Sequence, residues 1–376
     1  MVLVALGKAA PGMAQAAARI LGARLTCGVV TIPPGLHPPP LPGLAQIPAG
    51  HPLPDEGSLA AGQAVQQMLR DLRPQDVVLV LVSGGGSSML EIPLEGIDLA
   101  HLRAVNDLLI RSGATIHEIN TVRTALSAVK GGGLAALAAP ARIIGLLISD
   151  VVGDRPEAVA SGPTVAAASQ RASAHDVIEA YGLEPLLPRE VMKALGAPTR
   201  PAPLTTPLNV VVADNRMGLR AAAAAAERLG YAVHLSHEPM QGETHQVARA
   251  FSLALRRSRP PVCLLLGGET TIAVQGGGRG GRNQSFALCA AIELNGDPGS
   301  LLAAIASDGV DGPTDAAGAV VDGQTVSRMQ AQGIDPQDHL SRRDAYPALR
   351  AAGALLLGGP TGTNVGDIVI GLRSML

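Results

Sequence analysis

The stretch DVVLVLV, Asp76–Val82, consists of an aspartate and the six consecutive apolar residues that follow it. Such a run, without alternation of apolar and polar residues, is typical of a strand that is buried on both faces of a parallel sheet. Two further runs have the same character, MVLVAL at Met1–Leu6 and ARIIGLLI at Ala141–Ile148. Ala-rich helical patterns lie between the strands. The alternation predicts a doubly wound α/β domain.

The same alternation continues along the rest of the chain. In the first half we also expect helix 13–21, strand 25–31 and a helix that ends near residue 72. In the second half we expect strands at 208–213, 231–236, 262–266 and 301–306, and helices at 217–229, 244–256 and 283–294. The Pro-rich segment PTRPAPLTTP, 198–207, is the best linker candidate. We therefore predict two α/β domains, at 1–204 and 205–376.

The composition excludes several classes of protein. Apolar residues make up 47% and charged residues 16% of the chain, which is typical of a globular protein. A net charge of −2 gives no bulk attraction to nucleic acid, and a chain with no Trp, three Tyr and two Phe has few side chains on which bases could stack. The three cysteines are widely spaced, which argues against disulfides and a zinc site. Without a signal peptide or an apolar membrane span, we expect a soluble cytoplasmic protein with no membrane partner.

Polar, glycine-rich loops follow five of the expected strands. They read GKAAPG at 7–12, SGGGSS at 83–88, SDVVGD at 149–154, GGET at 267–270 and SDGVDG at 307–312. Ligands of open α/β sheets bind at the carboxyl ends of strands. Five such loops therefore favour a site built from strand ends.

Two loops in the second half indicate the chemistry. GGGRGGRNQ, Gly276–Gln284, places Arg282 ahead of a helical run, where a guanidinium and a helix N-terminus suit phosphate. SDGVDGPTDAAG, Ser307–Gly318, places Asp308, Asp311 and a third aspartate in one loop after an apolar strand. Carboxylates there suit Mg²⁺ or a hydroxyl that must lose a proton. Together the two loops indicate phosphoryl transfer.

The remaining candidates share a position next to these loops. Lys8 is a candidate catalytic residue that would pair with phosphate oxygens. The candidates for nucleotide or phosphate binding are Ser83, Gly84, Gly85, Gly86, Ser87, Ser88, Gly268, Glu269 and Asn283. The candidates for substrate binding are His51, Asp55 and Asn364, and Asp150 joins Asp308 and Asp311 as a candidate metal ligand.

Ordinary structural roles stand beside each of these. Lys8 could be a solvated surface lysine, and Glu269 either a ligand or a helix cap. The arginines could be solvated beside a turn that Asn283 caps, and Asp-Gly pairs form turns without any ligand. For Lys130, ahead of three glycines at a helix end, the structural interpretation is favoured.

Several motifs are missing from the chain. It contains no GxxxxGK[ST] of a Walker ATPase, no HRD or DFG of a protein kinase, and neither HExxH nor CxxC. No GxGxxG follows a strand with an acidic residue about 20 positions later, so a nicotinamide-dependent dehydrogenase has poor support.

An ordered set of motifs runs from Gly7 to Val365: GKAAPGM, GHPLPDEGS, VSGGGSSM, INTVRTALSAVKGGGLA, ISDVVGD, ASGPT, GGETT, GGRNQ, SDGVDGPTDAAG and GPTGTNV. This set resembles the glycerate 2-kinases of the MOFRL class. The resemblance implies a Rossmann-like N-terminal domain, a smaller C-terminal α/β domain and an active site in the cleft between them. It also implies that ATP, with a divalent cation such as Mg²⁺, phosphorylates D-glycerate to 2-phosphoglycerate. The lysine and the arginine suspected in that family fall on Lys8 and Arg282.

We therefore expect a kinase that works by direct in-line transfer, in which Lys8 and Arg282 hold phosphate oxygens or the glycerate carboxylate. Asp308 would hold Mg²⁺ or accept the proton of the 2-hydroxyl. Two alternatives stay open: a hydroxypyruvate reductase, a label that some relatives carry, and a non-catalytic regulator that binds a nucleotide or metabolite. A homo-oligomer also stays open.

Overall fold

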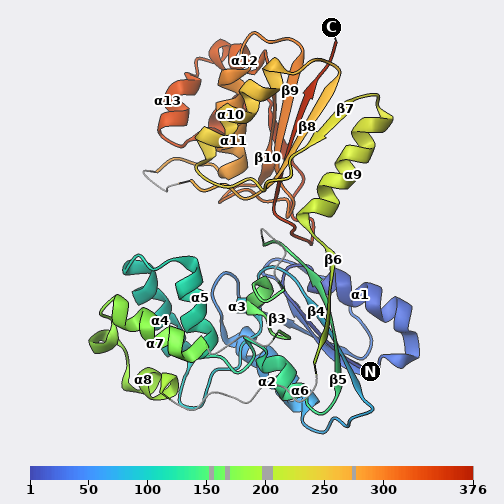
Figure 1. The fold of residues 1–376 in the computed structure, drawn as a ribbon, viewed down its shortest axis with the longest axis vertical. Helices are drawn as coiled ribbons and strands as arrows, with labels where there is room; N and C mark the ends of the chain where they lie inside the picture. The colour runs from blue at the N-terminus through green and yellow to red at the C-terminus, as the bar shows by residue number, and fades with distance from the viewer. Residues whose placement is uncertain (152–155, 166–169, 197–205, 273–276, 376) are drawn as a thin grey trace. The chain divides into compact units, whose positions relative to one another are not determined.

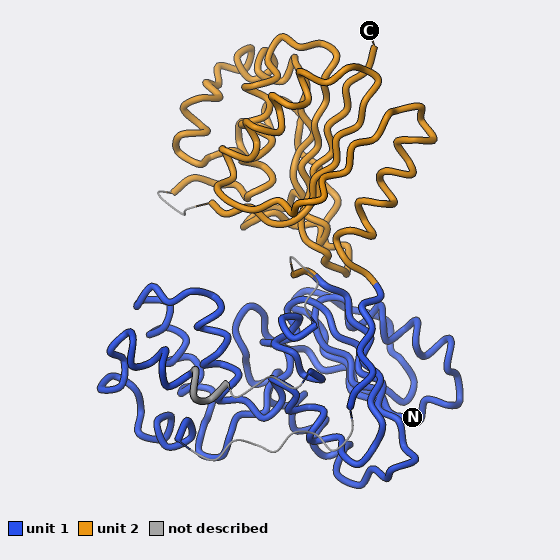
Figure 2. Tube along the Cα trace, viewed as in Figure 1, with its two compact units in different colours: residues 1–149, 154–212 blue, residues 150–153, 213–376 orange. Residues whose placement is uncertain are grey.

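The computed structural model describes residues 1–151, 156–165, 170–196, 206–272 and 277–375, which form two compact units (Figure 2). Unit 1 comprises Met1–Ser149 and Asp154–Val212, and unit 2 comprises Asp150–Gly153 and Ala213–Leu376. The predicted boundary between residues 204 and 205, and most of the predicted linker, lie outside the described residues. The expectation of two α/β domains is confirmed at the level of the fold.

Unit 1 is built on a six-stranded sheet in the order β3-β2-β1-β4-β5-β6 (Figure 1). The strands are β1 (Val2–Leu6), β2 (Cys27–Ile32), β3 (Leu44–Pro48), β4 (Val77–Val82), β5 (Arg142–Ile148) and β6 (Leu208–Ala213). The pairs β1–β2, β1–β4, β2–β3 and β4–β5 are all parallel. Since the strand order reverses direction between β1 and β4, the carboxyl ends of these two strands mark the switch point where such sheets bind ligands.

Helices cover this sheet and extend beyond one side of it. They are α1 (Ala10–Leu21), α2 (Glu56–Leu69), α3 (Gly86–Met89), α4 (Leu99–Arg111), α5 (Ile116–Ala125), α6 (Gly133–Ala138), α7 (Gln170–Ala180) and α8 (Arg189–Leu195). The 3₁₀ turns are η1 (Gly22–Arg24), η2 (Val159–Ser161) and η3 (Glu184–Leu186). Helix α1 packs on one face, where Ala10 and Ala14 meet Leu3 and Leu81, and α2 and α6 lie on the other (Figure 1). Helices α4, α5, α7 and α8 share a separate apolar core.

Unit 2 contains a mixed sheet in the order β11-β10-β9-β12-β8-β7. Its strands are β7 (Ala232–Leu235), β8 (Val262–Gly268), β9 (Ser300–Ala306), β10 (Ala316–Asp322), β11 (Leu355–Leu357) and β12 (Asp367–Arg373). Among the described strand pairs of this sheet, β7–β8 is parallel and the others are antiparallel. Strand β12 therefore runs antiparallel to both of its neighbours, β8 and β9.

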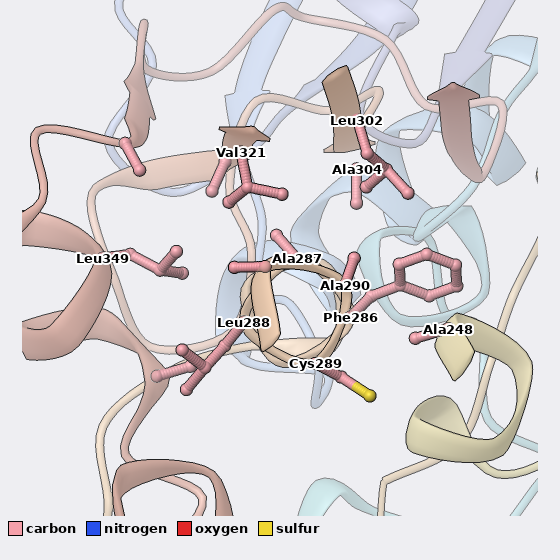
Figure 3. Close-up of a cluster of buried hydrophobic side chains, with 14 of the residues drawn as sticks. Ala248, Phe286, Ala287, Leu288, Cys289, Ala290, Leu302, Ala304, Val321 and Leu349 are labelled. Atoms are coloured by element: carbon pink, nitrogen blue, oxygen red, sulfur yellow. The ribbon is translucent and has the colours of Figure 1, made fainter. Parts of the chain in front are cut away.

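The helices described in unit 2 lie on the two faces of this second sheet. They are α9 (Asn215–Arg228), α10 (Thr244–Arg257), α11 (Arg282–Glu293), α12 (Thr325–Ala331), α13 (Pro336–Ser341) and α14 (Ala345–Ala351). Side chains alternate across the strands, so Val369 of β12 packs on the α11 side while Ile368 and Ile370 pack on the α9 side. In Figure 3, α11 is surrounded by apolar side chains of the strands and of α10 and α14. Helix α11 therefore lies in the centre of the apolar core of unit 2.

One expected element lies in a different place. The sequence pattern predicts that the strand at 208–213 begins the second domain, but β6 is hydrogen-bonded to β5 at the edge of the first sheet. The residues of this segment predict a strand, but they do not indicate which sheet it joins, because a short edge strand carries no pattern that is specific to one neighbouring strand. Its alternating exposure is that of a sheet edge. In the described part of the chain, no helix is both long and apolar enough to cross a membrane.

Candidate active site

The switch point of the first sheet brings together the loops that follow β1 and β4. The amide of Lys8 donates to the carbonyl of Gly84 at 2.8 Å, and the amide of Ala9 donates to Oγ of Ser83 at 2.9 Å. Within the described residues, the amides of Gly84 and Gly85 donate to no backbone carbonyl. The structure therefore places Lys8 beside the SGGGSS loop, as strand-end placement predicted.

The close approach of these two loops requires glycine at position 7. Gly7 has φ +104°, and a Cβ there would lie 2.3 Å from the carbonyl oxygen of Ser83. Replacing Gly7 with alanine is expected to lower the free energy of unfolding by about 2 kcal/mol or more, because both the strained φ and the clash must be relieved. Urea denaturation would measure it.

The matched control is Gly12→Ala, which lies in α1 with nothing within 4 Å of the added Cβ. Alanine is the better helix former, so this variant should be as stable as the parent or up to about 1 kcal/mol more stable. Equal stability of the two variants would contradict the packing of the β1 and β4 loops.

Two residues expected to bind substrate have different surroundings. Nδ1 of His51 lies 3.1 Å from Oγ of Ser88, and a Cβ on Gly85 would touch the His51 ring, so the imidazole belongs to the same cluster. Asp55 instead caps α2: its Oδ1 accepts hydrogen bonds from the amides of Ser58 and Gly50 at 2.9 and 2.8 Å. Burial raises the pKa of Asp55, but these bonds lower it below its usual value. The structure gives Asp55 a capping role and leaves its predicted contact with substrate untested.

A third segment, absent from the predicted site, joins the same cluster. Oγ of Ser161 lies 2.9 Å from Oγ of Ser87, and the amide of Gly131 donates to the Ser161 carbonyl at 2.9 Å. Ala160 and Ser161 have φ of 49° and 60°, in the left-handed region. Such strained backbone persists where surrounding contacts hold it, and it is frequent at functional sites. The ASGPT motif is thus a neighbour of the glycine-rich loop.

Behind these loops lies a buried ion pair between Lys130 and Glu91, whose side chains are 3% and 4% exposed. Oγ of Ser127 donates to Glu91 at 2.5 Å. Burial lowers the pKa of Arg123, and the charge of nearby Glu91 opposes that change. The structural interpretation of Lys130 is consistent with this burial. Because Glu91 follows the SGGGSS loop and Lys130 precedes the three glycines, the pair ties both segments together.

In unit 2, Arg282 is the first residue of α11 and faces two carboxylates. Its Nη1 donates to Oε2 of Glu269 at 3.1 Å, and its Nη2 lies 3.3 Å from Oδ2 of Asp367. Burial would lower the pKa of Arg282, but Asp367 and Glu269 raise it overall. Glu269 is reached through Gly268, whose φ of +137° lets the chain pass close to Met240. Glu269 is therefore a partner of Arg282 and not a helix cap.

The N-terminus of α11 is capped from a distance. The sequence offers Asn283 as the cap, but the helix begins at Arg282 with Gly281 at the N-cap position. The carboxylate of Asp311 accepts hydrogen bonds from the amides of Asn283 and Gln284 at 3.1 and 2.8 Å. Burial raises the pKa of Asp311, opposed by these amides. A buried carboxylate so occupied fixes the start of α11, and with it the backbone of Arg282.

Asp367, which was not among the predicted site residues, is a buried carboxyl group beside Arg282. Burial raises its pKa to about 7; Arg282 and a hydrogen bond from Asn283 oppose the rise, and the charges of Glu269 and Asp311 add to it. The only sequence signal was its place at the end of GGPTGTNVGD, directly before an apolar strand.

The raised pKa of Asp367 predicts a dependence of stability on pH. The folded state binds this proton more tightly than the unfolded state, so stability is lost as pH rises through about 7. Between pH 5 and pH 8, the parent is expected to lose roughly 2–3 kcal/mol of unfolding free energy more than Asp367→Asn, which has no proton to release there. An equal change of the unfolding free energy in the parent and in Asp367→Asn between the two pH values would contradict this prediction.

The three expected metal ligands do not gather around one point. Asp311 is committed to α11, while Oδ2 of Asp150 accepts a hydrogen bond from Nδ2 of Asn364 at 3.3 Å and Oδ1 of Asp308 accepts one from the amide of Val310 at 3.1 Å. Among the described residues, no group of three His, Cys, Asp or Glu side chains could hold a metal ion. Asp154 of the SDVVGD loop lies outside the described residues.

Asn364 links two of the loops that follow strands. Its Oδ1 accepts hydrogen bonds from Oγ of Ser307 at 3.2 Å and from the amide of Gly366 at 3.1 Å, while its amide group reaches Asp150. The structure thereby brings Asn364, Asp150 and the Asp308 loop together within unit 2. The expected cleft between the domains stays a prediction.

Two α/β units, each with basic and glycine-rich loops at strand ends, are typical of an enzyme that binds phosphorylated ligands. Known proteins agree with this class. The DUF4147 family, described as a domain of unknown function, matches residues 1–196, and the MOFRL family matches residues 262–367. A D-glycerate 2-kinase of Thermotoga maritima is 41% identical over 99% of this chain and 90% of the relative.

Two further relatives extend the comparison. A putative hydroxypyruvate reductase of Agrobacterium vitis is also 41% identical, over 98% of this chain and 97% of the relative. The crystal structure of a glycerate kinase from Thermotoga maritima has a TM-score of 0.92 at 40% identity and covers 99% of this chain and 91% of that one. The chain belongs to the glycerate 2-kinase family of DUF4147 and MOFRL proteins.

Proposed function

We propose that this protein transfers the γ-phosphoryl group of ATP to the 2-hydroxyl of D-glycerate. The observation that carries the proposal is Arg282, held at the first turn of α11 by carboxylates and by a helix cap that is itself buried. A guanidinium fixed at a helix N-terminus suits a carboxylate or phosphate of the substrates. The glycerate kinase relatives at about 40% identity support the choice of substrate.

The predicted site residues would divide the tasks of this reaction. Lys8 and the amides of Gly84 and Gly85 would neutralise phosphate oxygens, since phosphoryl transfer needs mainly positioning and charge stabilisation. Arg282 would orient one anionic group of glycerate or ATP. Asp308 would either accept the proton of the 2-hydroxyl or supply a carboxylate to Mg²⁺.

Mg²⁺ fits this donor set only as an ion brought in with ATP. Magnesium in phosphoryl-transfer sites keeps several waters and uses one or two protein carboxylates together with substrate phosphates. Asp308, with Asp150 as a second candidate, could supply such a carboxylate, whereas Asp311 is occupied by α11. When bound, the ion would neutralise phosphate charge. A cytoplasmic location and the oligomeric state stay predictions.

The test is ³¹P NMR of the purified protein with D-glycerate, ATP and Mg²⁺. We expect a 2-phosphoglycerate signal that depends on both substrates. A 3-phosphoglycerate signal would keep the kinase and change the hydroxyl. No phosphorylated glycerate, from protein shown to be folded, would reject the proposal.

One observation favours a second candidate. A relative of equal identity is named a putative hydroxypyruvate reductase, and the first sheet has the strand order of dinucleotide-binding folds. Oxidation of NADH or NADPH that depends on hydroxypyruvate would support it. The absence of a GxGxxG fingerprint makes it the weaker candidate.

A further inference from the structure

The two carboxylates on Arg282 differ sharply in their surroundings. The side chain of Asp367 is 3% exposed and that of Glu269 is 39% exposed. Both lie at the same end of two neighbouring strands, because β12 begins at Asp367 and pairs there with Gly268, the last residue of β8. One guanidinium therefore has a buried partner and a solvated partner.

Asp367 is fixed by its backbone as well as by burial. It pairs with Gly268 on one side and with Ala306 on the other, in the middle of the sheet. Its carbonyl accepts a hydrogen bond from Nδ2 of Asn215 at 3.0 Å. Burial and this fixed backbone hold the Asp367 carboxylate beside Arg282.

Glu269 is held much less firmly. It lies just beyond the end of β8, and its amide donates to the Met240 carbonyl at 3.0 Å, which fixes the backbone but leaves the side-chain torsions open. An ion pair this exposed is weak, because water solvates both charges and side-chain entropy opposes the contact. With both carboxylates in place, the guanidinium has no uncompensated positive charge to offer an anion.

We propose that Glu269 occupies the position on Arg282 that an anionic group of the substrate takes, and that Asp367 orients the guanidinium throughout. The inference rests on the proposed function, since it names the carboxylate of D-glycerate or a phosphate group as the displacing anion. Glu269 is then a competitor for the anion site and not a contact of the ligand. Asp367 is a positioning residue that acts through Arg282.

The experiment compares Glu269→Gln and Asp367→Asn, which each remove one negative charge beside the same arginine. Calorimetry at pH 8 would measure binding of two probes, D-glycerate and inorganic phosphate, to each full-length variant. Glu269→Gln is expected to lower Kd about three- to tenfold, because the displaced ion pair no longer opposes binding. Asp367→Asn is expected to raise Kd about tenfold or more, because Arg282 loses its orientation. The probe that responds identifies the anion.

Glu238→Gln is the matched control, since it removes an exposed glutamate of unit 2 that has no recorded contact with Arg282. Its Kd should equal that of the parent, which separates a local effect from a change in net charge. Tighter binding in both Arg282-partner variants, or weaker binding in Glu269→Gln, would overturn the inference. So would unchanged binding in Glu269→Gln.

Failure of the inference is distinguishable from failure of the proposed function. Turnover of ATP and D-glycerate with no effect of Glu269→Gln on Kd keeps the kinase and rejects the competitor. Tighter phosphate binding in Glu269→Gln without turnover keeps the competitor and rejects the kinase. If the parent binds neither probe and shows no turnover of ATP and D-glycerate, both are rejected.

Discussion

Replacing Arg282 with lysine is expected to lower kcat/KM for D-glycerate by about 100-fold. An ammonium keeps the charge but cannot present two parallel N–H groups, and it cannot face Glu269 and Asp367 at once as Nη1 and Nη2 do. The ratio kcat/KM is the quantity to compare, because the guanidinium orients a group that reacts. Steady-state kinetics with varied D-glycerate would measure it.

Arg279→Lys supplies the control from the same loop. The guanidinium of Arg279 instead stacks on the Tyr346 ring, 4.1 Å from its centroid. Its replacement should change kcat/KM by less than about threefold, since stacking of this kind contributes little at an exposed site. Equal losses in the two variants would mean that the whole loop, and not the Arg282 side chain, carries the effect.

Replacing Glu91 with glutamine is expected to destabilise unit 1 by about 3–5 kcal/mol, because it leaves Lys130 buried without its counter-charge. Arg123, which the charge of Glu91 also stabilises, loses the same partner. A change of that size should be visible as a lower midpoint in urea denaturation and as a lower Tm.

The double variant Glu91→Leu with Lys130→Met tests the reason for this loss. Two apolar residues of similar volume remove both charges together, so the double variant should be closer in stability to the parent than Glu91→Gln is. If it is as unstable as the single variant, the volume or the hydrogen bond from Ser127, and not the unpaired charge, explains the destabilisation.

The fold of unit 1 was largely predictable because its central strands are buried on both faces. Runs such as Asp76–Val82 leave one interpretation, a parallel strand, and helices between them fix the winding. Partners in the sheet were not predictable where a strand is short and at an edge, as β6 shows. In unit 2 the mixed order places β12 between β8 and β9, and nothing in the apolar pattern of these strands encodes that order.

The candidate site followed the same division. Lys8, His51 and the SGGGSS loop come together because strand ends of a parallel sheet meet at one edge, which is a rule that a sequence can use. Glu91 and Asp367 could not be found this way. Their importance depends on burial and on partners distant in the chain, which no local pattern records.

The central position of β12 also determines when the protein can fold during its synthesis. Unit 1 is complete once β6 has emerged, and it can fold while the ribosome is still translating. The second sheet must wait for Asp367–Arg373, because β8 and β9 have no direct pairing without that strand. Until then, the edges of β8 and β9 are open to other chains, and Arg282 lacks its buried carboxylate. Nascent chains that stall before residue 367 would thus have a folded first half and an aggregation-prone, inactive second half.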